Sequence, residues 1–106
     1  MCSIRETRKH RKFIRNLQQS EAQTQRMIQR AMQRVSQRVA ADTPHDEIML
    51  ETSKEYARLM CVPSDLFDAY VATVLSNFYA ELVRTSPDDP LLDTDAGQQA
   101  LEAKDA

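Results

Sequence analysis

Pairs of large apolar residues recur every four positions between residues 66 and 83, and no other feature constrains the fold of this chain as strongly. An α-helix completes a turn in about 3.6 residues, so these pairs form one broad apolar stripe along a helix. A stripe two residues wide is typical of the central helix of a bundle. The pairs are Leu66/Phe67, Tyr70/Val71, Val74/Leu75, Phe78/Tyr79 and Leu82/Val83.

The segment before this helix is predicted to be a second helix, so that the two form a hairpin. Thr43 stands where an N-cap residue is expected, and Pro44 fits the first helical position. The helix should continue to about Met60. Pro63 ends it, because proline disfavours helical geometry in the residue before it. Ser64 is then the expected N-cap of the apolar helix.

A four-residue unit that begins with Gln-Arg is repeated four times between residues 25 and 40. Each unit turns a helix by about 400°, so successive arginines form a slowly winding stripe. Ile28, Met32 and Val35 form an apolar stripe beside it, at the spacing of an amphipathic helix. Ser20 with Gln23 fits a capping box, so this region and the preceding one are either one long helix or two helices joined near Ser20. The arginines are Arg26, Arg30, Arg34 and Arg38.

The composition favours helices throughout. One glycine and four prolines in 106 residues are too few for a β-rich protein, which needs many turn residues. We therefore predict an all-α fold with a long basic N-terminal helix and a helical hairpin, which together form a three-helix core. Three such helices carry more apolar surface than a core of this size hides, so we expect homodimerisation to complete it.

Charge divides the chain into two halves of opposite sign. Residues 1–41 contain ten Lys/Arg and two acidic residues, a net charge of +8, whereas residues 42–106 carry a net −10. We predict a basic arm at 1–19, a helical domain at 20–84 and an acidic, partly disordered tail at 85–106. The predicted basic patch comprises Arg8, Lys9, Arg11, Lys12, Arg15, Arg26, Arg30 and Arg34.

Three interpretations of the basic patch remain open. Clustered arginine and lysine are typical of a surface that binds nucleic acid. The same residues also fit an acidic protein surface, or a solvated face whose arginines pair with acids of the second half. Two observations count against nucleic acid: the acidic half repels a polyanion, and Phe13 is the single aromatic residue of the basic half.

Residues that support catalysis or metal binding are sparse. The histidines His10 and His45 stand at no ligand spacing from a cysteine, and the single glycine, Gly97, excludes a glycine-rich phosphate loop. No apolar secretory run follows the basic N-terminus, so we expect Cys2 and Cys61 to be reduced thiols of a cytoplasmic protein. No apolar run approaches the ~20 residues of a membrane span. We expect no enzyme activity, no cofactor and no metal site.

Large side chains near the turn of the hairpin form the predicted partner-binding site. Aromatic residues and methionine are favoured in interfaces, because they supply a large or adaptable contact area. A three-helix core is thinnest at this end, so side chains here should reach solvent. The mid-helix residues Leu75 and Phe78 are expected to be core instead. The predicted binding residues are Tyr56, Met60, Phe67 and Tyr70.

The hairpin at 43–84, broken at Cys61-Val62-Pro63-Ser64, resembles the small helical antiactivators of bacterial quorum-sensing receptors, the QslA-like proteins directed at LasR-type receptors. The resemblance implies a cytoplasmic dimer that binds the ligand-binding domain of a transcription factor and blocks receptor dimerisation. We predict a small cytoplasmic regulatory protein that inhibits or adapts a protein partner by helix packing. The alternatives are a nucleic-acid-binding protein that uses the basic arm, and an assembly component such as a small chaperone or phage scaffold.

Overall fold

The computed structural model describes residues 4–105, and the side-chain surroundings of residues 8–103. Cys2 therefore lies outside the described residues. No β-strand occurs between residues 4 and 105, so the predicted all-α class is confirmed. The elements are α1 (Ile4–Asn16), α2 (Glu21–Arg38), α3 (His45–Leu59), α4 (Phe67–Thr85), a short 3-10 helix η1 (Pro90–Asp93) and α5 (Asp95–Asp105).

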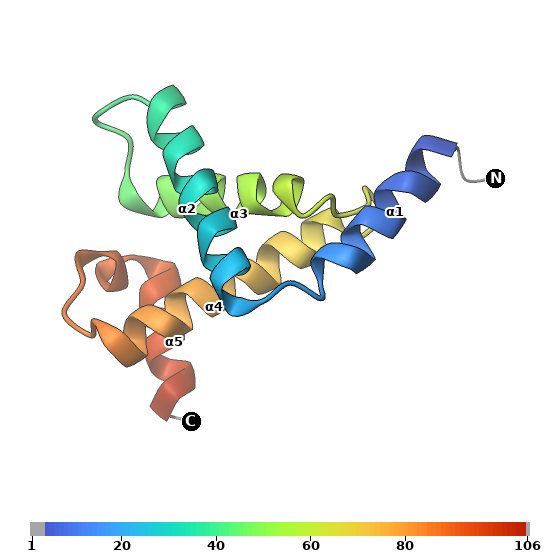
Figure 1. Ribbon diagram of the computed structural model, residues 1–106. Coiled ribbons are helices and arrows are strands. Elements are labelled where there is room, and N and C mark those ends of the chain that lie inside the picture. Colours follow the sequence, from blue (N-terminus) through green and yellow to red (C-terminus); the bar gives the residue numbers. More distant parts are fainter. Residues whose placement is uncertain (1–3, 106) are drawn as a thin grey trace.

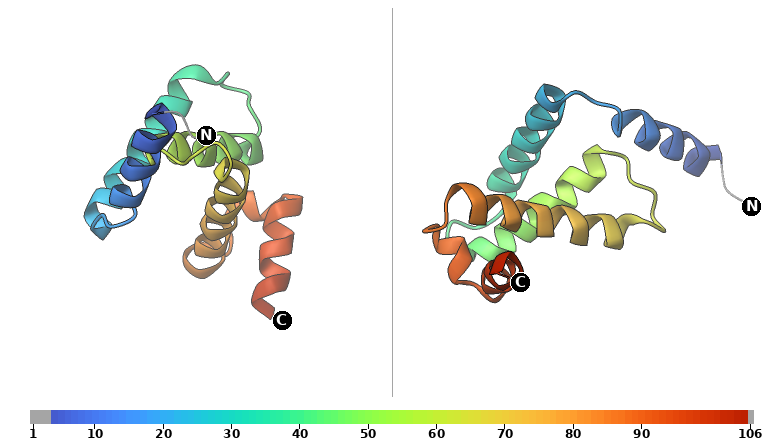
Figure 2. Two further views of the ribbon diagram at one scale, coloured as in Figure 1. Left: turned by 90° about the vertical axis from the view of Figure 1, so that its right-hand side faces the viewer. Right: turned by 90° about the horizontal axis from the view of Figure 1, so that it is seen from below.

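The helices are arranged around a hairpin formed by α3 and α4 (Figure 1). Helix α2 packs on α3, whereas α5 and η1 pack on α4. Helix α1 lies beside the loop that closes the hairpin (Figure 1). Two further views show α1 and α5 at opposite ends of the molecule (Figure 2). The basic first helix and the acidic last helix are therefore far apart.

The basic N-terminal region forms two helices joined near Ser20. Of the two possibilities that we predicted, the single long helix is therefore wrong. Ser20 has extended backbone geometry (φ −66°, ψ 161°), through which a helix does not continue. Its hydroxyl accepts a hydrogen bond from the Gln23 N–H at 3.2 Å, and the Gln23 side chain accepts one from the Ser20 N–H at 3.1 Å. The predicted capping box is thus present, and it starts α2 in a new direction.

The predicted first residues of both hairpin helices are wrong. Pro44, not Thr43, is the N-cap of α3, because the Thr43 hydroxyl donates to a carbonyl of the preceding turn. Ser64 does not cap α4 either. Residues 64–66 form a separate turn, and α4 begins at Phe67. At Thr43 this side-chain hydrogen bond competes with capping, whereas at Ser64 the backbone forms the turn, in which the Phe67 N–H donates to the Ser64 carbonyl at 3.4 Å.

Cys61 terminates α3 in the left-handed conformation, with a φ of 62°. Its N–H donates to the Arg58 carbonyl at 3.0 Å, and the N–H of Val62 donates to the Ala57 carbonyl at 3.2 Å. This pair of bonds is the Schellman motif, which usually has glycine at the left-handed position. Val62 is 1% exposed, so its burial holds the chain in a conformation that a cysteine rarely adopts.

Two apolar clusters form the core. The larger draws residues from α1, α2, α3 and α4, so four helices contribute where the sequence predicted three. The smaller joins α4 to the C-terminal segment through Tyr79, Val83 and Leu92. Buried members of the larger cluster are Phe13, Ala31, Tyr56, Ala57, Met60, Val62, Val71 and Val74.

The segment that we predicted as an acidic, partly disordered tail contains two helices. In the structure its residues 90–93 and 95–105 are helical and pack on α4. Leu92 is 2% exposed, and Leu91 and Leu101 pack against the smaller cluster. Four acidic residues of this segment are exposed, namely Asp88, Asp93, Asp95 and Glu102, while its leucines meet the far end of α4. This separation of polar and apolar sides explains how so polar a segment docks.

Candidate binding surfaces

Two of the four predicted partner-binding residues are core residues. Tyr56 is 7% exposed and Met60 is 3% exposed, so neither is available to a partner in this structure. The rings of Tyr56 and Tyr70 stack at 6.5 Å between centroids. Burial and the neighbouring Tyr56 raise the pKa of Tyr70 to about 12, so its hydroxyl stays protonated at neutral pH. Tyr70 and Phe67 keep only part of their surface exposed.

Helix α1 is the reason why the closed end of the hairpin is covered. The ring of Phe13 packs edge-on against Tyr70, with 5.5 Å between the centroids. The side-chain amide of Asn16 donates to the Met60 carbonyl at 2.9 Å. The sequence placed Phe13 in a basic arm, whereas the structure uses it to close the core. Phe67 is partly covered as well, because the Arg58 guanidinium lies 5.9 Å from the centre of its ring.

An apolar groove opens between α2, α3 and α4. Its volume is about 420 Å³, within the range of natural binding cavities, and it is half open to solvent. It lies where the two core clusters meet, because Ile28 and Phe78 pack on the larger cluster and Leu82 packs on the smaller one. Its apolar lining comprises Ile28, Met32, Ile48, Met49, Phe78, Leu82 and Leu91.

Polar groups at the groove are few and mostly satisfied. The Thr52 hydroxyl donates to the Ile48 carbonyl at 2.8 Å, and Glu81 is paired with Arg84. Met32, on the α2 side, is 55% exposed and is one of four large apolar side chains that are exposed in the described part of the chain. The sequence placed Ile28, Met32 and Val35 in one apolar stripe but contained no signal that Val35 is buried whereas Met32 is exposed.

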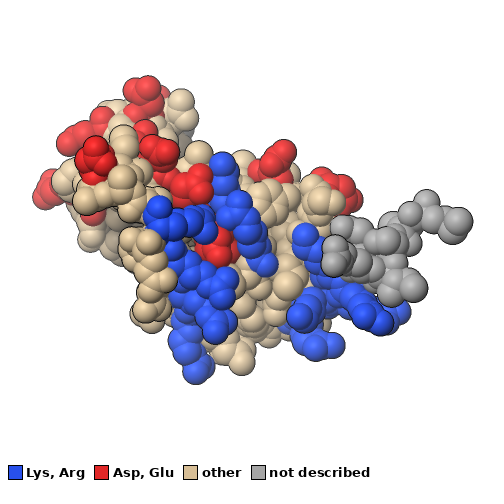
Figure 3. Space-filling view, turned by 90° about the horizontal axis from the view of Figure 1, so that it is seen from above, with Lys and Arg blue, Asp and Glu red and all other residues tan. Residues whose placement is uncertain are grey.

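The basic residues of α1 and α2 gather on one face of the molecule (Figure 3). Of the residues of the predicted basic patch on α1, Lys9 is half-buried and the others are exposed. Arg26 and Arg30 on α2 are exposed as well. Acidic residues lie mainly at the edges of this face (Figure 3). The exposed members on α1 are Arg8, Arg11, Lys12 and Arg15.

Glu55 of α3 neutralises the other half of the arginine stripe. Its side chain, 7% exposed, accepts hydrogen bonds from Arg34 at 3.3 Å and from Arg38 at 3.0 Å. Arg58 donates to the same carboxylate at 3.1 Å. Burial acts to raise the pKa of Glu55, but the hydrogen bonds from the three arginines outweigh it and hold that pKa below its ordinary value. Arg34 and Arg38 thus fasten α2 to α3, as one of the three interpretations predicted.

Replacing Glu55 by glutamine is expected to lower the free energy of unfolding at pH 7 by about 2 kcal/mol, because three charge-assisted hydrogen bonds lose their anion. The arginines remain about half exposed, which limits the loss. Because the folded-state pKa is lowered, the stabilisation is present above the ordinary pKa of 4.5 and is lost as the pH falls below it. Urea unfolding of both proteins across this range measures the difference.

The matched control is Glu102→Gln, which removes an exposed carboxylate from α5. It should change the unfolding free energy by less than about 0.5 kcal/mol at any pH. A Glu55→Gln protein as stable as the wild type at pH 7 would show that this network contributes nothing to the α2–α3 contact.

Among the described residues, no group of three His, Cys, Asp or Glu converges at distances that could hold a metal ion. None of the helices between residues 4 and 105 is both long enough and apolar enough to cross a bilayer.

No protein-family model, curated protein or solved structure matches this chain. The fold and surfaces by themselves therefore define the class: a small all-helical protein with an open apolar groove and a separate basic face.

Proposed function

We propose that this chain is a regulatory binding protein that takes up the apolar face of an amphipathic helix from a protein partner in the groove between α2, α3 and α4. The observation that carries the proposal is the exposure of Met32 beside a half-open apolar groove. Exposed apolar surface of this kind marks an interaction site, because leaving it in water is unfavourable. Methionine is common at such sites, since its flexible side chain adapts to a partner.

A helix fits the groove better than a small molecule does. A small-molecule site usually buries most of its ligand, whereas this groove is half open and its occupant must keep one face in water. An amphipathic helix has that property, with apolar side chains on one face at positions i, i+3, i+4 and i+7. Few polar groups line the groove, so binding would rest on apolar packing.

A regulatory role agrees with the resemblance to quorum-sensing antiactivators, which implies a transcription factor as the partner. Cytoplasmic location and the absence of catalysis belong to the same proposal. In this role the protein would occupy a helix that the partner needs for its own dimerisation, and so inhibit it.

Partner binding is tested by Met32→Glu, with Gln29→Glu as the control. Both residues are exposed on α2, but Gln29 does not line the groove. A photo-crosslinker at position 32 should capture a partner through the apolar face of one of its helices. Mass spectrometry of the crosslinked peptide identifies that helix.

Met32→Glu should then weaken binding of the captured partner about 30-fold, as for loss of an interface anchor worth about 2 kcal/mol. Equal affinities for the two variants, or capture of an apolar small molecule alone, would refute the proposal.

Homodimerisation is part of the proposal, and Ile14 and Leu17 support it. Ile14 on α1 is 46% exposed, and Leu17, in the turn directly after α1, is 55% exposed. Sedimentation equilibrium at micromolar concentration should give twice the chain mass of 12.2 kDa. A double variant, Ile14→Lys with Leu17→Lys, should sediment as a monomer with unchanged helix content. A wild-type protein that stays monomeric is the opposing result.

A further inference from the structure

The exposed cations of α1 form a single stripe that points away from the core. Arg8, Arg11, Lys12 and Arg15 follow one another at helical spacings of three, four and seven, so they lie on one side of the helix. Phe13, at a different angle on the same helix, packs into the core and thereby fixes the orientation of the stripe. The sequence has no acidic residue between Arg8 and Ser20, so nothing within this segment neutralises the stripe.

Arg26 and Arg30 of α2 continue the basic face. Both are exposed, and among the described residues no carboxylate lies within ion-pair distance of either. Arg34 and Arg38, in contrast, both form ion pairs with Glu55. The arginine stripe of α2 therefore has a structural half near its C-terminus and an unpaired half near its N-terminus.

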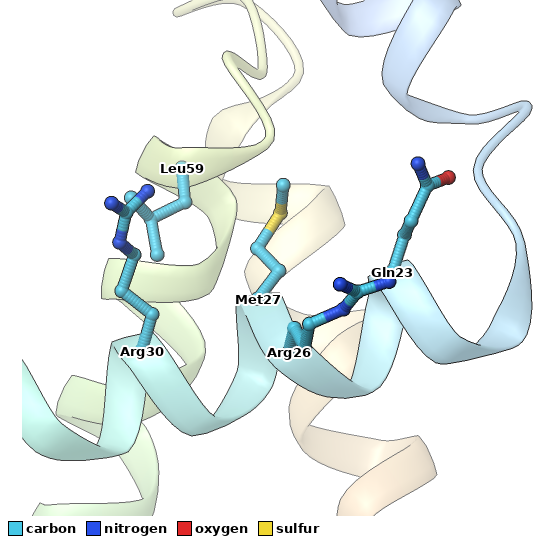
Figure 4. A pocket seen from close by; sticks show the side chains of 5 residues that line it. All are labelled: Gln23, Arg26, Met27, Arg30 and Leu59. Atoms are coloured by element: carbon cyan, nitrogen blue, oxygen red, sulfur yellow. The ribbon is translucent and has the colours of Figure 1, made fainter.

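A hollow of about 290 Å³ lies beside the unpaired half, between α2 and α3. Figure 4 shows Met27 and Leu59 on its apolar floor, with the side chains of Arg26 and Arg30 on either side of Met27. Gln23 lines the end nearest to the α1–α2 connection (Figure 4). The hollow lies on the opposite flank of α2 from the proposed helix-binding groove, which Ile28, Met32 and Ser36 line.

We propose that this hollow and the α1 stripe bind an acidic protein segment that carries one large apolar side chain. The apolar side chain would rest on Met27 and Leu59, and carboxylates on either side of it would pair with Arg26 and Arg30. Further acidic residues of the segment would reach the α1 stripe. The surface is separate from the helix-binding groove, so it extends the proposed function and does not depend on the same residues.

A nucleic acid fits this surface less well. Single-stranded nucleic acid is bound by exposed aromatic rings on which bases stack, and the one aromatic residue of α1 and α2, Phe13, is 8% exposed. Duplex phosphates would pair with the arginines but would leave the apolar floor without a contact. An acidic segment with an apolar anchor uses the cations and the floor together.

The test uses fluorescence anisotropy with three labelled probes: an Asp/Glu-rich peptide with one central phenylalanine, the same peptide with alanine in its place, and a DNA duplex of the same net charge. The full chain should bind the phenylalanine peptide at least about tenfold more tightly than the alanine peptide, because the anchor gains apolar burial. Equal affinity for the two peptides, or tighter binding of the duplex than of either, would overturn the proposal.

Variants locate the site. Arg26→Glu together with Arg30→Glu should weaken binding of the phenylalanine peptide by at least about tenfold, since two charge-assisted contacts become repulsive. Met27→Asp should remove the preference for the phenylalanine peptide over the alanine peptide.

The control is Arg84→Glu, which changes an exposed arginine of α4 and should bind the peptide like the wild type. Circular dichroism checks that each variant is folded. If Arg84→Glu weakens binding as much as the α2 variants do, the attraction is unspecific and the site is refuted. Met32→Glu should leave peptide binding unchanged, so failure of the groove proposal and failure of this one are distinguishable.

Discussion

Tyr56→Ala is expected to lower the free energy of unfolding by about 4 kcal/mol, the usual cost of removing a buried aromatic ring. The ring is 7% exposed and lies 6.5 Å from the ring centres of both Tyr70 and Phe78. The melting temperature should fall by about 20 °C, at the 4–8 °C per kcal/mol typical of chains of this size.

Tyr56→Phe is the matched control, because it keeps the ring and removes only the hydroxyl. It should cost about 1 kcal/mol or less. The comparison separates a core residue from the partner-binding residue that the sequence predicted. If Tyr56→Ala melted within a few degrees of the wild type and lost only partner affinity, the buried position of this ring would be wrong.

Gly97→Ala is expected to cost about 3 kcal/mol, the upper end of the usual range for an overpacked site. A Cβ at this position would lie against the backbone of Leu92, 2.6 Å from the Leu91 carbonyl oxygen and 2.7 Å from the Leu92 carbonyl carbon. These atoms belong to the backbone, so no side-chain rotation relieves the contact. The first turn of α5 must therefore separate from η1, and Leu92 loses its burial against α4.

Gln99→Ala, at an exposed position of the same helix, is the control for Gly97→Ala. Alanine favours a helix slightly more than glutamine does, so this variant should be as stable as the wild type or marginally more stable. Hydrogen exchange of the α5 amides measures the predicted separation directly. Unchanged protection of these amides in Gly97→Ala would contradict the close packing of α5 on η1.

Local patterns in the sequence were sufficient to predict helices and some of the residues at which they begin or end. The four-residue apolar pairs predicted α4, and the Ser20–Gln23 capping box predicted the start of α2. Both signals depend on contacts within about one turn of helix, which is why they can be found without the tertiary structure. The start of α4 was missed by two residues, because the turn at 64–66 moves the N-cap from Ser64 to Leu66.

The binding surfaces were less predictable, because exposure depends on how helices far apart in the sequence cover one another. The sequence by itself determined the all-α class, the arginine stripe and the opposite charges of the two halves. Only the tertiary structure decided that Phe13 packs on Tyr70 at the hairpin end and that Tyr56 is buried, whereas Met32 stays exposed beside a groove. It also divided the arginine stripe, because the buried carboxylate of Glu55 pairs with Arg34 and Arg38, whereas no carboxylate among the described residues pairs with Arg26 or Arg30.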